Sequence, residues 1–298
     1  MHRVVGVIGL GKMGLPIARN LMERGFEVVG HRRSGSPELT EAGGIHVGSP
    51  AEVAARADVI VSILPDEAAV AAVIEGPRGT LSALRPGTVH LEMSTIDVAA
   101  KDRLRTAVRA AGGDLLDCPI SGGPGMVGPR LATTFASGEE SAVESVRPVL
   151  DAISGPWVLA GPFGAGAHLK YVSSLLVAVH TVAAAEALAL AARAGLDLDL
   201  VQRTLDGSIA GSAILKQRGP WMRRRAWWPA PGPIDTLHPI LDQTEAYAAS
   251  LGVPATVFAS AKNVFDKAVA EGLGDLDISC VHDQITGLPA ADRRGVVA

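Results

Sequence analysis

The chain has 298 residues, of which 48% are hydrophobic and 19% are charged, so its composition is that of a globular protein long enough for two domains. Its 27 basic and 31 acidic residues give a formal net charge of −4. Without a basic excess, the overall charge argues against a partner that is nucleic acid or an anionic membrane surface.

Short β-rich runs alternate with alanine-rich helical runs from residue 4 to about residue 160. This alternation predicts βαβ units and a largely parallel sheet covered by helices on both faces. We therefore predict an α/β fold that begins with a Rossmann-type doubly wound sheet, in a domain of residues 1–162. The predicted strands are Val4–Ile8, Glu27–His31, Val59–Ile63, Thr88–Leu91, Asp114–Leu116, Thr133–Ala136 and Trp157–Ala160. The predicted helices between them include Leu15–Glu23, Asp66–Ile74 and Val98–Ala110.

The character of the sequence changes at Gly161-Pro162-Phe163-Gly164. A run from Ala165 to Ala194 follows, and it predicts one helix of about 30 residues, or about 45 Å. Because its middle is apolar on nearly every side, we expect this helix to be buried all round. The rest of residues 163–298 predicts an all-helical domain for substrate binding and dimerisation around this central helix. Its further helices are expected at Asp199–Leu205, Asp242–Ser250, Ala255–Glu271 and Ser279–Gln284.

About a hundred residues are too few to cover so apolar a helix, so we expect a second subunit to help and the protein to be a homodimer or homotetramer.

The uncharged stretch from Tyr171 to Ala185 is shorter than the ~20 residues that span a bilayer, and it contains polar side chains. The N-terminus runs directly into a strand and shows no signal peptide. Two cysteines make no disulfide framework, and nothing in the pattern predicts a metal site. We expect a soluble, cytoplasmic protein that binds neither membrane nor nucleic acid. The basic triplet Arg223–Arg225, followed by Trp227 and Trp228, predicts a surface loop beside a packed aromatic pair.

The first strand runs into a glycine turn at the start of a helix. A glycine at the first position permits the tight turn, one at the second lets a pyrophosphate approach the backbone, and one at the third packs the helix against the sheet. The positive end of the helix then faces the diphosphate. Strand, turn, helix and second strand are all present, which favours a dinucleotide site over a turn that binds nothing. The residues of the turn are Gly9, Leu10, Gly11, Lys12, Met13 and Gly14.

The second strand ends in His31, Arg32, Arg33 and Ser34. An NAD site normally has an acidic residue here, which accepts hydrogen bonds from the ribose 2′-hydroxyl. Guanidinium groups instead bind a 2′-phosphate in a bidentate manner, whereas a carboxylate would repel it. The tip therefore predicts NADP(H) in preference to NAD(H). The alternative is that both arginines are merely solvated.

Three further motifs follow predicted strands, where ligands of doubly wound sheets bind. Leu64 and Pro65 end one strand, and Ser94 and Thr95 end another, where hydroxyls could meet a nicotinamide ribose. Ser94 or Thr95 would also serve as the N-cap of the helix that starts near Asp97. The third motif is a turn that exposes a hydroxyl and consecutive backbone N–H groups, which suit a substrate carboxylate, although it could be a flexible turn only. Its residues are Ser121, Gly122 and Gly123.

Lys170 lies near the start of the long predicted helix, with Ser173 and Ser174 on the same face. A lysine donates a proton to a carbonyl, or accepts one from an alcohol, if burial or a positive nicotinamide ring lowers its pKa. Most single lysines on helices are only solvated, so local sequence alone does not assign this role.

Taken in order, these motifs resemble the β-hydroxyacid dehydrogenase family, which includes 3-hydroxyisobutyrate dehydrogenase and tartronate semialdehyde reductase. The resemblance covers nearly the whole chain. It rests on Gly9 to Gly14, Leu64-Pro65, Ser94-Thr95-Ile96, Asp117 to Gly123, Gly164 to Lys170, Ala185-Glu186-Ala187 and Ala194 to Asp197. It implies NAD(P)-dependent hydride transfer between a 3-hydroxy acid and its semialdehyde. Lys170 would be the general acid and base, and Ser121 to Gly123 with Ser174 would bind the substrate.

The substrate half departs from the family pattern. The family usually has two asparagines where this chain has Ser173 and Ser174, and serine has a shorter reach. The Lys-Asp-Leu motif that usually precedes the C-terminal helix is replaced by a segment that begins at His238. Arg130 stands where glycine is usual, and His31 where asparagine is usual. These changes leave the cofactor half intact and put the identity of the substrate in doubt.

Two other functions compete with this interpretation. An imine reductase has the same architecture, but its members usually replace the lysine and lack the segment that Asp117 begins. A non-catalytic NADP-binding module that acts through dimerisation is favoured only by the lost asparagines and the lost Lys-Asp-Leu motif, and the retained Lys170 argues against it.

Overall fold

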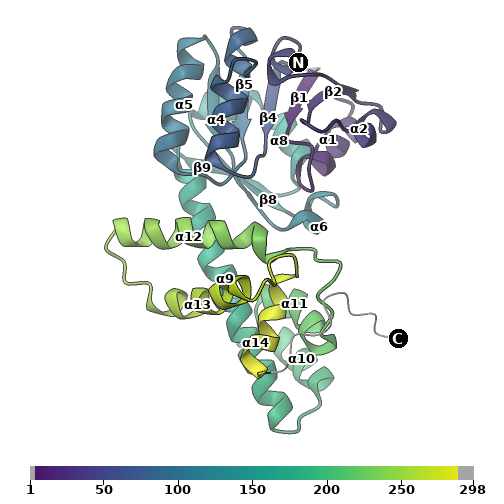
Figure 1. Ribbon diagram of the computed structural model, residues 1–298, viewed down its shortest axis with the longest axis vertical. Helices are drawn as coiled ribbons and strands as arrows, with labels where there is room; N and C mark the ends of the chain where they lie inside the picture. The colour runs from purple at the N-terminus through teal and green to yellow at the C-terminus, as the bar shows by residue number, and fades with distance from the viewer. Residues whose placement is uncertain (1–3, 288–298) are drawn as a thin grey trace. The chain divides into compact units, whose positions relative to one another are not determined.

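The computed structural model describes residues 4–287, which divide into two compact units, one ending at Lys170 and one beginning at Tyr171. The first unit holds all nine named strands of the described chain (Figure 1). The strands are β1 (Val4–Ile8), β2 (Glu27–His31), β3 (Ile45–His46), β4 (Val59–Ser62), β5 (Val89–Glu92), β6 (Asp114–Asp117), β7 (Ile120–Ser121), β8 (Thr133–Ser137) and β9 (Trp157–Gly161). The boundary predicted after residue 162 stays a prediction.

The sheet has the order β3-β2-β1-β4-β5-β6-β8-β7, with β9 paired to β8. All pairs from β3 to β6 are parallel, which is the strand order of a dinucleotide-binding domain. β8 runs antiparallel to β6 and β7, and β9 is parallel to β8. The predicted Rossmann-type sheet is confirmed, and the β1–β4 pair lies where the direction of winding reverses.

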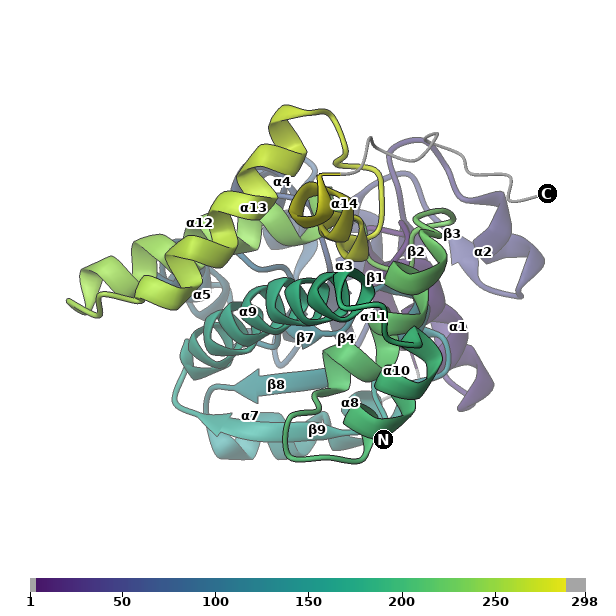
Figure 2. The same ribbon diagram turned by 90° about the horizontal axis from the view of Figure 1, so that it is seen from below.

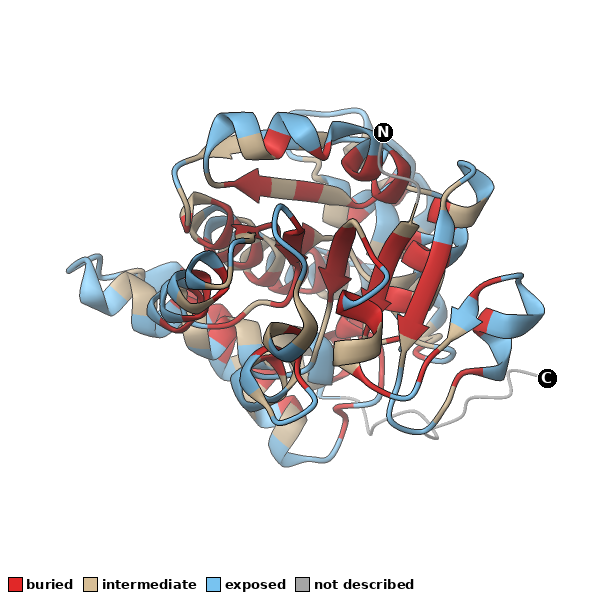
Figure 3. Ribbon diagram, turned by 90° about the horizontal axis from the view of Figure 1, so that it is seen from above, coloured by how far each residue is buried: buried red, intermediate tan, exposed pale blue. Residues whose placement is uncertain are grey.

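Helices cover both faces of this sheet. They are α1 (Gly14–Glu23), α2 (Pro37–Glu41), α3 (Pro50–Ala54), α4 (Glu67–Glu75), α5 (Val98–Ala110), α6 (Pro124–Val127), α7 (Glu140–Ser145) and α8 (Arg147–Ile153). Successive strand side chains point to opposite faces, so Val59 and Val61 pack with α1 and α8, whereas Ile60 packs with α3. The central strands are therefore buried along almost their whole length (Figure 3).

The named elements of the second unit are all helices within its described residues, as predicted. Its helices are the remainder of α9 (Ala165–Arg193), then α10 (Leu198–Asp206), α11 (Ala213–Arg224), α12 (Ile234–Ser250), α13 (Thr256–Ala270) and α14 (Val281–Thr286). α12 and α13 lie side by side (Figure 2). The core of this unit forms where Ala185 and Leu188 of α9 meet Phe258 and Phe265 of α13.

The long helix is not buried all round, which corrects the expectation from its composition. Leu169, Val172, Leu176 and Leu190 are 39%, 54%, 46% and 73% exposed. Their spacing of three, four and fourteen residues places them along one side of α9. By length and composition alone, α9 could also cross a membrane, a test that core helices of globular proteins pass as well. The packing of its other side against α13 shows that α9 is the central helix of this unit.

The basic triplet does not lie in a loop. Arg223 and Arg224 occupy the last turn of α11, and Arg225 forms a bidentate ion pair with Asp283 at 2.9 and 3.0 Å. Trp227 is buried and donates to the same carboxylate, whereas Trp228 is 50% exposed, so only one of the two tryptophans is packed.

Candidate functional site

The predicted glycine turn is tightly built between β1 and α1. Gly9 has a φ of +96°, and its N–H donates to the carbonyl of His31 at 3.1 Å. A Cβ on Gly9 would lie 2.2 Å from the Ile63 carbonyl oxygen, and one on Gly14 would lie 2.1 Å from the Gly9 carbonyl oxygen. Both positions require glycine because backbone from three segments meets there.

Gly11 differs from Gly9 and Gly14 because no protein atom lies in the direction where a side chain would point. A Cβ built there would meet nothing within 4 Å. No side chain caps the N-terminus of α1. The Leu15 and Ile17 N–H groups donate to the carbonyls of Gly11 and Met13, which leaves the Gly14 amide at the start of the helix available to an anion. This arrangement fits a diphosphate above the turn. Lys12 is exposed and Met13 half-buried, but the Leu10 side chain is fully buried in the core, so Leu10 can contribute only its backbone.

The tip of β2 is held by two imidazoles. His31 Nδ1 lies 2.9 Å from the Val47 carbonyl oxygen, and His46 Nε2 lies 3.3 Å from the Arg32 carbonyl oxygen. Arg32, Arg33 and Ser34 are exposed, and neither guanidinium has an ion-pair partner within residues 4–287. Two uncompensated arginines beside an exposed hydroxyl fit the 2′-phosphate of NADP(H).

The loops after β4 and β5 are joined by hydrogen bonds. The Leu64 N–H donates to Ser94 Oγ at 2.8 Å, and the Ser94 N–H donates to Glu92 Oε1 at 2.6 Å. Ser94 is therefore buried, while Thr95 is half-buried and Pro65 exposed. The prediction that Ser94 or Thr95 caps α5 is wrong, because Asp97 does so by accepting from the amides of residues 99 and 100.

A polar network that the sequence did not predict lies beneath these loops. Glu92 accepts a hydrogen bond from Ser62, and burial raises the pKa of its carboxyl group. The Nε2 atom of His90 lies 2.7 Å from Ser62 Oγ, and burial lowers the pKa of this imidazole to about 3. Lys101 of α5 and Asp117 of β6 are both fully buried, and they form an ion pair of 2.7 Å. No local motif marks Lys101, because a helical lysine is normally solvated.

Asp117 and Ser137 hold the start of α9. Gly164, with a φ of +91°, has no side chain to cap the helix that follows. The Ala167 N–H donates instead to Asp117 Oδ2 at 2.8 Å, and the Gly166 N–H donates to Ser137 Oγ at 3.0 Å. Two amides that a local cap would satisfy are thus satisfied from the ends of β6 and β8.

Lys170 follows one turn later and is buried, with 8% of its surface exposed. Burial lowers the pKa of Lys170 to about 8. Its ammonium group has no hydrogen-bond or ion-pair partner in the described part of the first unit. A buried amine that titrates near neutral pH can exchange a proton with a substrate oxygen.

The glycine motif and the cap of α9 lie at opposite ends of β8, because Ser121 pairs with Thr133 and Asp117 pairs with Ser137. Ser121 ends β7, and Gly123 immediately precedes α6, where no side-chain cap is present. Four residues, at most about 14 Å of chain, separate Ser121 from Asp117. Lys170 lies about 4.5 Å along α9 from Ala167, which is bonded to that same carboxylate. Of these two segments, only the start of α9 is hydrogen-bonded to Asp117. Ser174 is buried four residues beyond Lys170 on the same helix.

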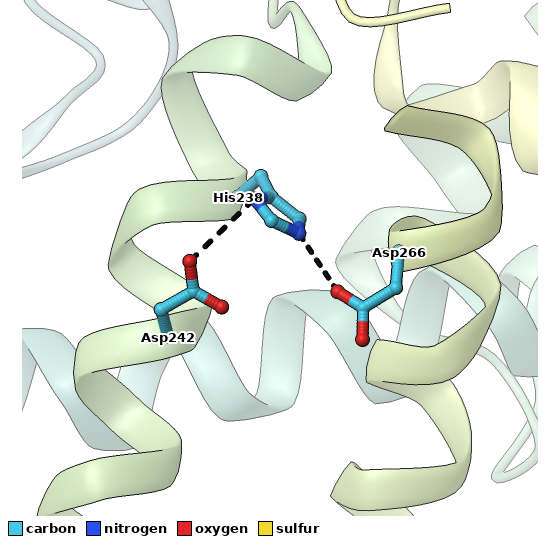
Figure 4. A group of neighbouring side chains, drawn as sticks. All are labelled: His238, Asp242 and Asp266. Atoms are coloured by element: carbon cyan, nitrogen blue, oxygen red, sulfur yellow. Dashed lines mark hydrogen bonds and ion pairs between the residues drawn. The ribbon is translucent and has the colours of Figure 1, made fainter. Parts of the chain in front are cut away.

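One further polar cluster lies in the second unit, where the family usually has its Lys-Asp-Leu motif. The ligand atoms of His238, Asp242 and Asp266 lie within 4.8 Å of one another (Figure 4). Lys262 balances their charge, because its Nζ lies 2.9 Å from Asp242 and 3.0 Å from Asp266. Burial lowers the pKa of Lys262, but these hydrogen bonds outweigh it and raise that pKa above its usual range. The cluster thus acts as an ion-pair network that joins α12 to α13.

Two family models match the chain, one in each half. The NAD binding domain of 6-phosphogluconate dehydrogenase matches residues 4–161, and the NAD-binding domain of NADP-dependent 3-hydroxyisobutyrate dehydrogenase matches residues 164–284. NAD(P)-binding domains are therefore present in this protein.

Named relatives match over almost their full lengths. L-threonate dehydrogenase from Cupriavidus necator is 32% identical, covering 97% of this chain and 98% of its own. 2-Hydroxy-3-oxopropionate reductase from Escherichia coli is 33% identical over 93% and 95% of the two chains. The crystal structure of 3-hydroxyisobutyrate dehydrogenase from Salmonella typhimurium has a TM-score of 0.84 at 30% identity, covering 94% of this chain and 99% of that one.

The glycine turn generates a matched pair of variants. We expect Gly11→Ala to leave the thermal midpoint of unfolding unchanged but to raise the Kd for NADPH about tenfold or more, because the new methyl meets only the nucleotide. Gly14→Ala should lower the free energy of unfolding by about 1–3 kcal/mol, because its methyl meets backbone. Calorimetry and fluorescence titration measure both effects. Destabilisation by Gly11→Ala would contradict the assignment of its open side to a ligand.

Proposed function

Because this chain belongs to the β-hydroxyacid dehydrogenase family of oxidoreductases, we propose that it interconverts a 3-hydroxy acid and its semialdehyde with NADP(H). The observation that carries this proposal is the buried amine of Lys170, whose pKa is lowered to about 8 by burial and whose helix starts at the carboxyl ends of β6 and β8. NADP(H), when bound, supplies or accepts the hydride.

Lys170 moves the proton that accompanies the hydride. In the oxidation direction its neutral amine accepts the proton of the substrate hydroxyl. In the reduction direction its ammonium form donates a proton to the carbonyl oxygen. A pKa near 8 keeps both forms populated close to neutral pH, which suits a group that works in both directions.

The turn at Ser121, Gly122 and Gly123 binds the substrate carboxylate through its hydroxyl and backbone N–H groups. The buried Ser174 hydroxyl, four residues beyond Lys170 on α9, is the further group that we assign to substrate binding. The relatives that are named for L-threonate and for 2-hydroxy-3-oxopropionate act on short hydroxylated acids, and their similarity supports that substrate class here.

The cofactor is NADP(H) in preference to NAD(H). Exposed Arg32 and Arg33, together with Ser34, support this choice because no carboxylate stands at the tip of β2 to bind a ribose 2′-hydroxyl.

The protein acts as a cytoplasmic homodimer or homotetramer. The exposed side of α9, with Leu169, Val172, Leu176 and Leu190, supports this proposal because a second copy would remove it from water.

Replacement of Lys170 tests the reaction and its lysine together. We expect Lys170→Ala to lower kcat by about a hundredfold or more, since the proton transfer loses its acid and base, while the Kd for NADPH stays within about threefold. The assay follows NADPH oxidation with 2-hydroxy-3-oxopropionate, succinic semialdehyde, glyoxylate and a cyclic imine, and NADP⁺ reduction with L-threonate and 3-hydroxyisobutyrate. Turnover of a cyclic imine alone would instead indicate an imine reductase, and no turnover at all would indicate a binding module.

The pKa of Lys170 sets opposite pH profiles in the two directions. For oxidation, kcat/KM should rise with pH and level off above about 8, because the neutral amine is the reactive form. For reduction, kcat/KM should fall above about 8, because the protonated form is lost. Initial rates between pH 6 and 10 measure both curves. Flat profiles across that range would contradict the role of this lysine.

The β2 tip determines the choice between the two nicotinamide cofactors. We expect wild-type protein to bind NADPH at least tenfold more tightly than NADH, a difference of about 1.4 kcal/mol, and the double variant Arg32→Ala/Arg33→Ala to lose this preference. Fluorescence titration gives both constants. Arg24→Ala, at the opposite end of α1, removes one positive charge away from this tip and should change neither constant. Equal affinities in the wild-type protein would overturn the assignment.

A further inference from the structure

Asp117 and Lys101 form an ion pair in the interior of the first unit. Both side chains have no solvent exposure, and the charged atoms lie 2.7 Å apart. Removing two charges from water carries a desolvation cost that their attraction often does not repay, so such a pair is weak support for stability alone. A buried ion pair beside the start of α9 therefore points to a role in positioning that helix.

The Asp117 carboxylate has two further hydrogen-bond partners besides Lys101. Its Oδ2 accepts from the Ala167 N–H at 2.8 Å and from Ser137 Oγ at 3.0 Å. Ser137 in turn accepts from the Gly166 N–H. A carboxylate at the N-terminus of a helix also interacts favourably with the helix dipole. The start of α9 is thus anchored to the sheet by side chains that are not its own.

Lys101 extends the network toward the loop after β5. Its Nζ donates to the Ser94 carbonyl oxygen at 2.6 Å, and Ser94 Oγ accepts from the Leu64 N–H. The same ammonium therefore contacts the segment assigned to the cofactor and the carboxylate that caps the helix of Lys170.

We propose that Asp117 is a positioning residue of the reaction, which orients Lys170 by capping α9 from the sheet, with Lys101 as its counter-ion. The inference rests on the proposed function of Lys170. Lys170 lies one helical turn beyond Ala167, so a shift of the first turn moves the amine with it. Misplacing a reacting group by about 1 Å can cost about a hundredfold in rate.

A matched control is available in α5 and β6, the two elements that carry Lys101 and Asp117. Asp114, at the other end of β6, pairs with Arg109 of α5 at 2.8 Å and with Arg105 at 3.3 Å, and within residues 4–287 it forms no hydrogen bond to α9. Asp114→Asn therefore weakens an α5–β6 ion pair without touching the cap. We expect it to lower the thermal midpoint and to leave kcat within about twofold of wild type.

The test compares Lys101→Met/Asp117→Asn with Lys101→Met/Asp117→Ala. Both variants remove the ion pair, but only asparagine keeps an oxygen that can accept from the Ala167 N–H. We expect kcat with NADPH and the best aldehyde of the panel to be at least about tenfold lower in the alanine variant than in the asparagine variant. The KM for NADPH should stay within about threefold in both. Hydrogen exchange of the peptide that covers residues 164–170 should be faster in the alanine variant.

Equal kcat and equal exchange in the two double variants would overturn the inference, as would an equally large loss of kcat in Asp114→Asn. If the double variants fail to fold, Ser137→Ala removes the acceptor of the Gly166 N–H and the hydrogen bonds from Ser137 to Asp117, but it keeps the ion pair with Lys101. It should lower kcat about threefold or more and speed the same exchange, and no change in either would count against the cap. If wild-type protein turned over nothing in the panel, the proposed function would fail, while hydrogen exchange would still decide whether Asp117 anchors α9.

Discussion

The buried carboxylate of Asp117 is the constraint on which the candidate site depends, because four segments meet at it. β6 presents the side chain, α5 supplies the counter-charge through Lys101, β8 supplies Ser137, and α9 supplies an amide. A buried charge without partners would cost several kcal/mol, so each of these groups must be in place for the others to be tolerated. The network thereby links the packing of the sheet to the position of the helix that carries Lys170.

The two halves of the site are built by different physical means. The nucleotide half is shaped mainly by backbone, since Gly9 and Gly14 allow segments to approach to distances that any Cβ would prevent. The half around Lys170 is shaped by side-chain hydrogen bonds and by burial, which lowers the pKa of Lys170 to about 8. Backbone geometry leaves a clear trace in the sequence as glycine, whereas a hydrogen-bond network between distant segments does not.

Particular elements show how far the sequence could be used. The seven predicted strands are found within one or two residues, because runs such as Val4–Ile8 are apolar, β-branched and bounded by turns. The two-residue strands β3 and β7 were missed since they are too short to show any period. α11 was missed because Gly219-Pro220 resembles a turn, yet Gly219 lies inside the helix where Gln202 packs against it. α12 begins at Ile234 and not at the predicted Asp242, because the helix continues through Pro239.

The sequence by itself determined the sheet, the glycine turn, the basic tip of β2 and the presence of Lys170, because each is a local pattern of residue types along one segment. Only the tertiary structure decided that Lys170 is buried, that Asp117 and Ser137 accept from the first amides of its helix, and that one side of α9 remains exposed. These features depend on groups far apart in the chain, such as residues 117 and 167. Burial and hydrogen bonding between such groups are properties of the folded arrangement, and no spacing in the sequence encodes them.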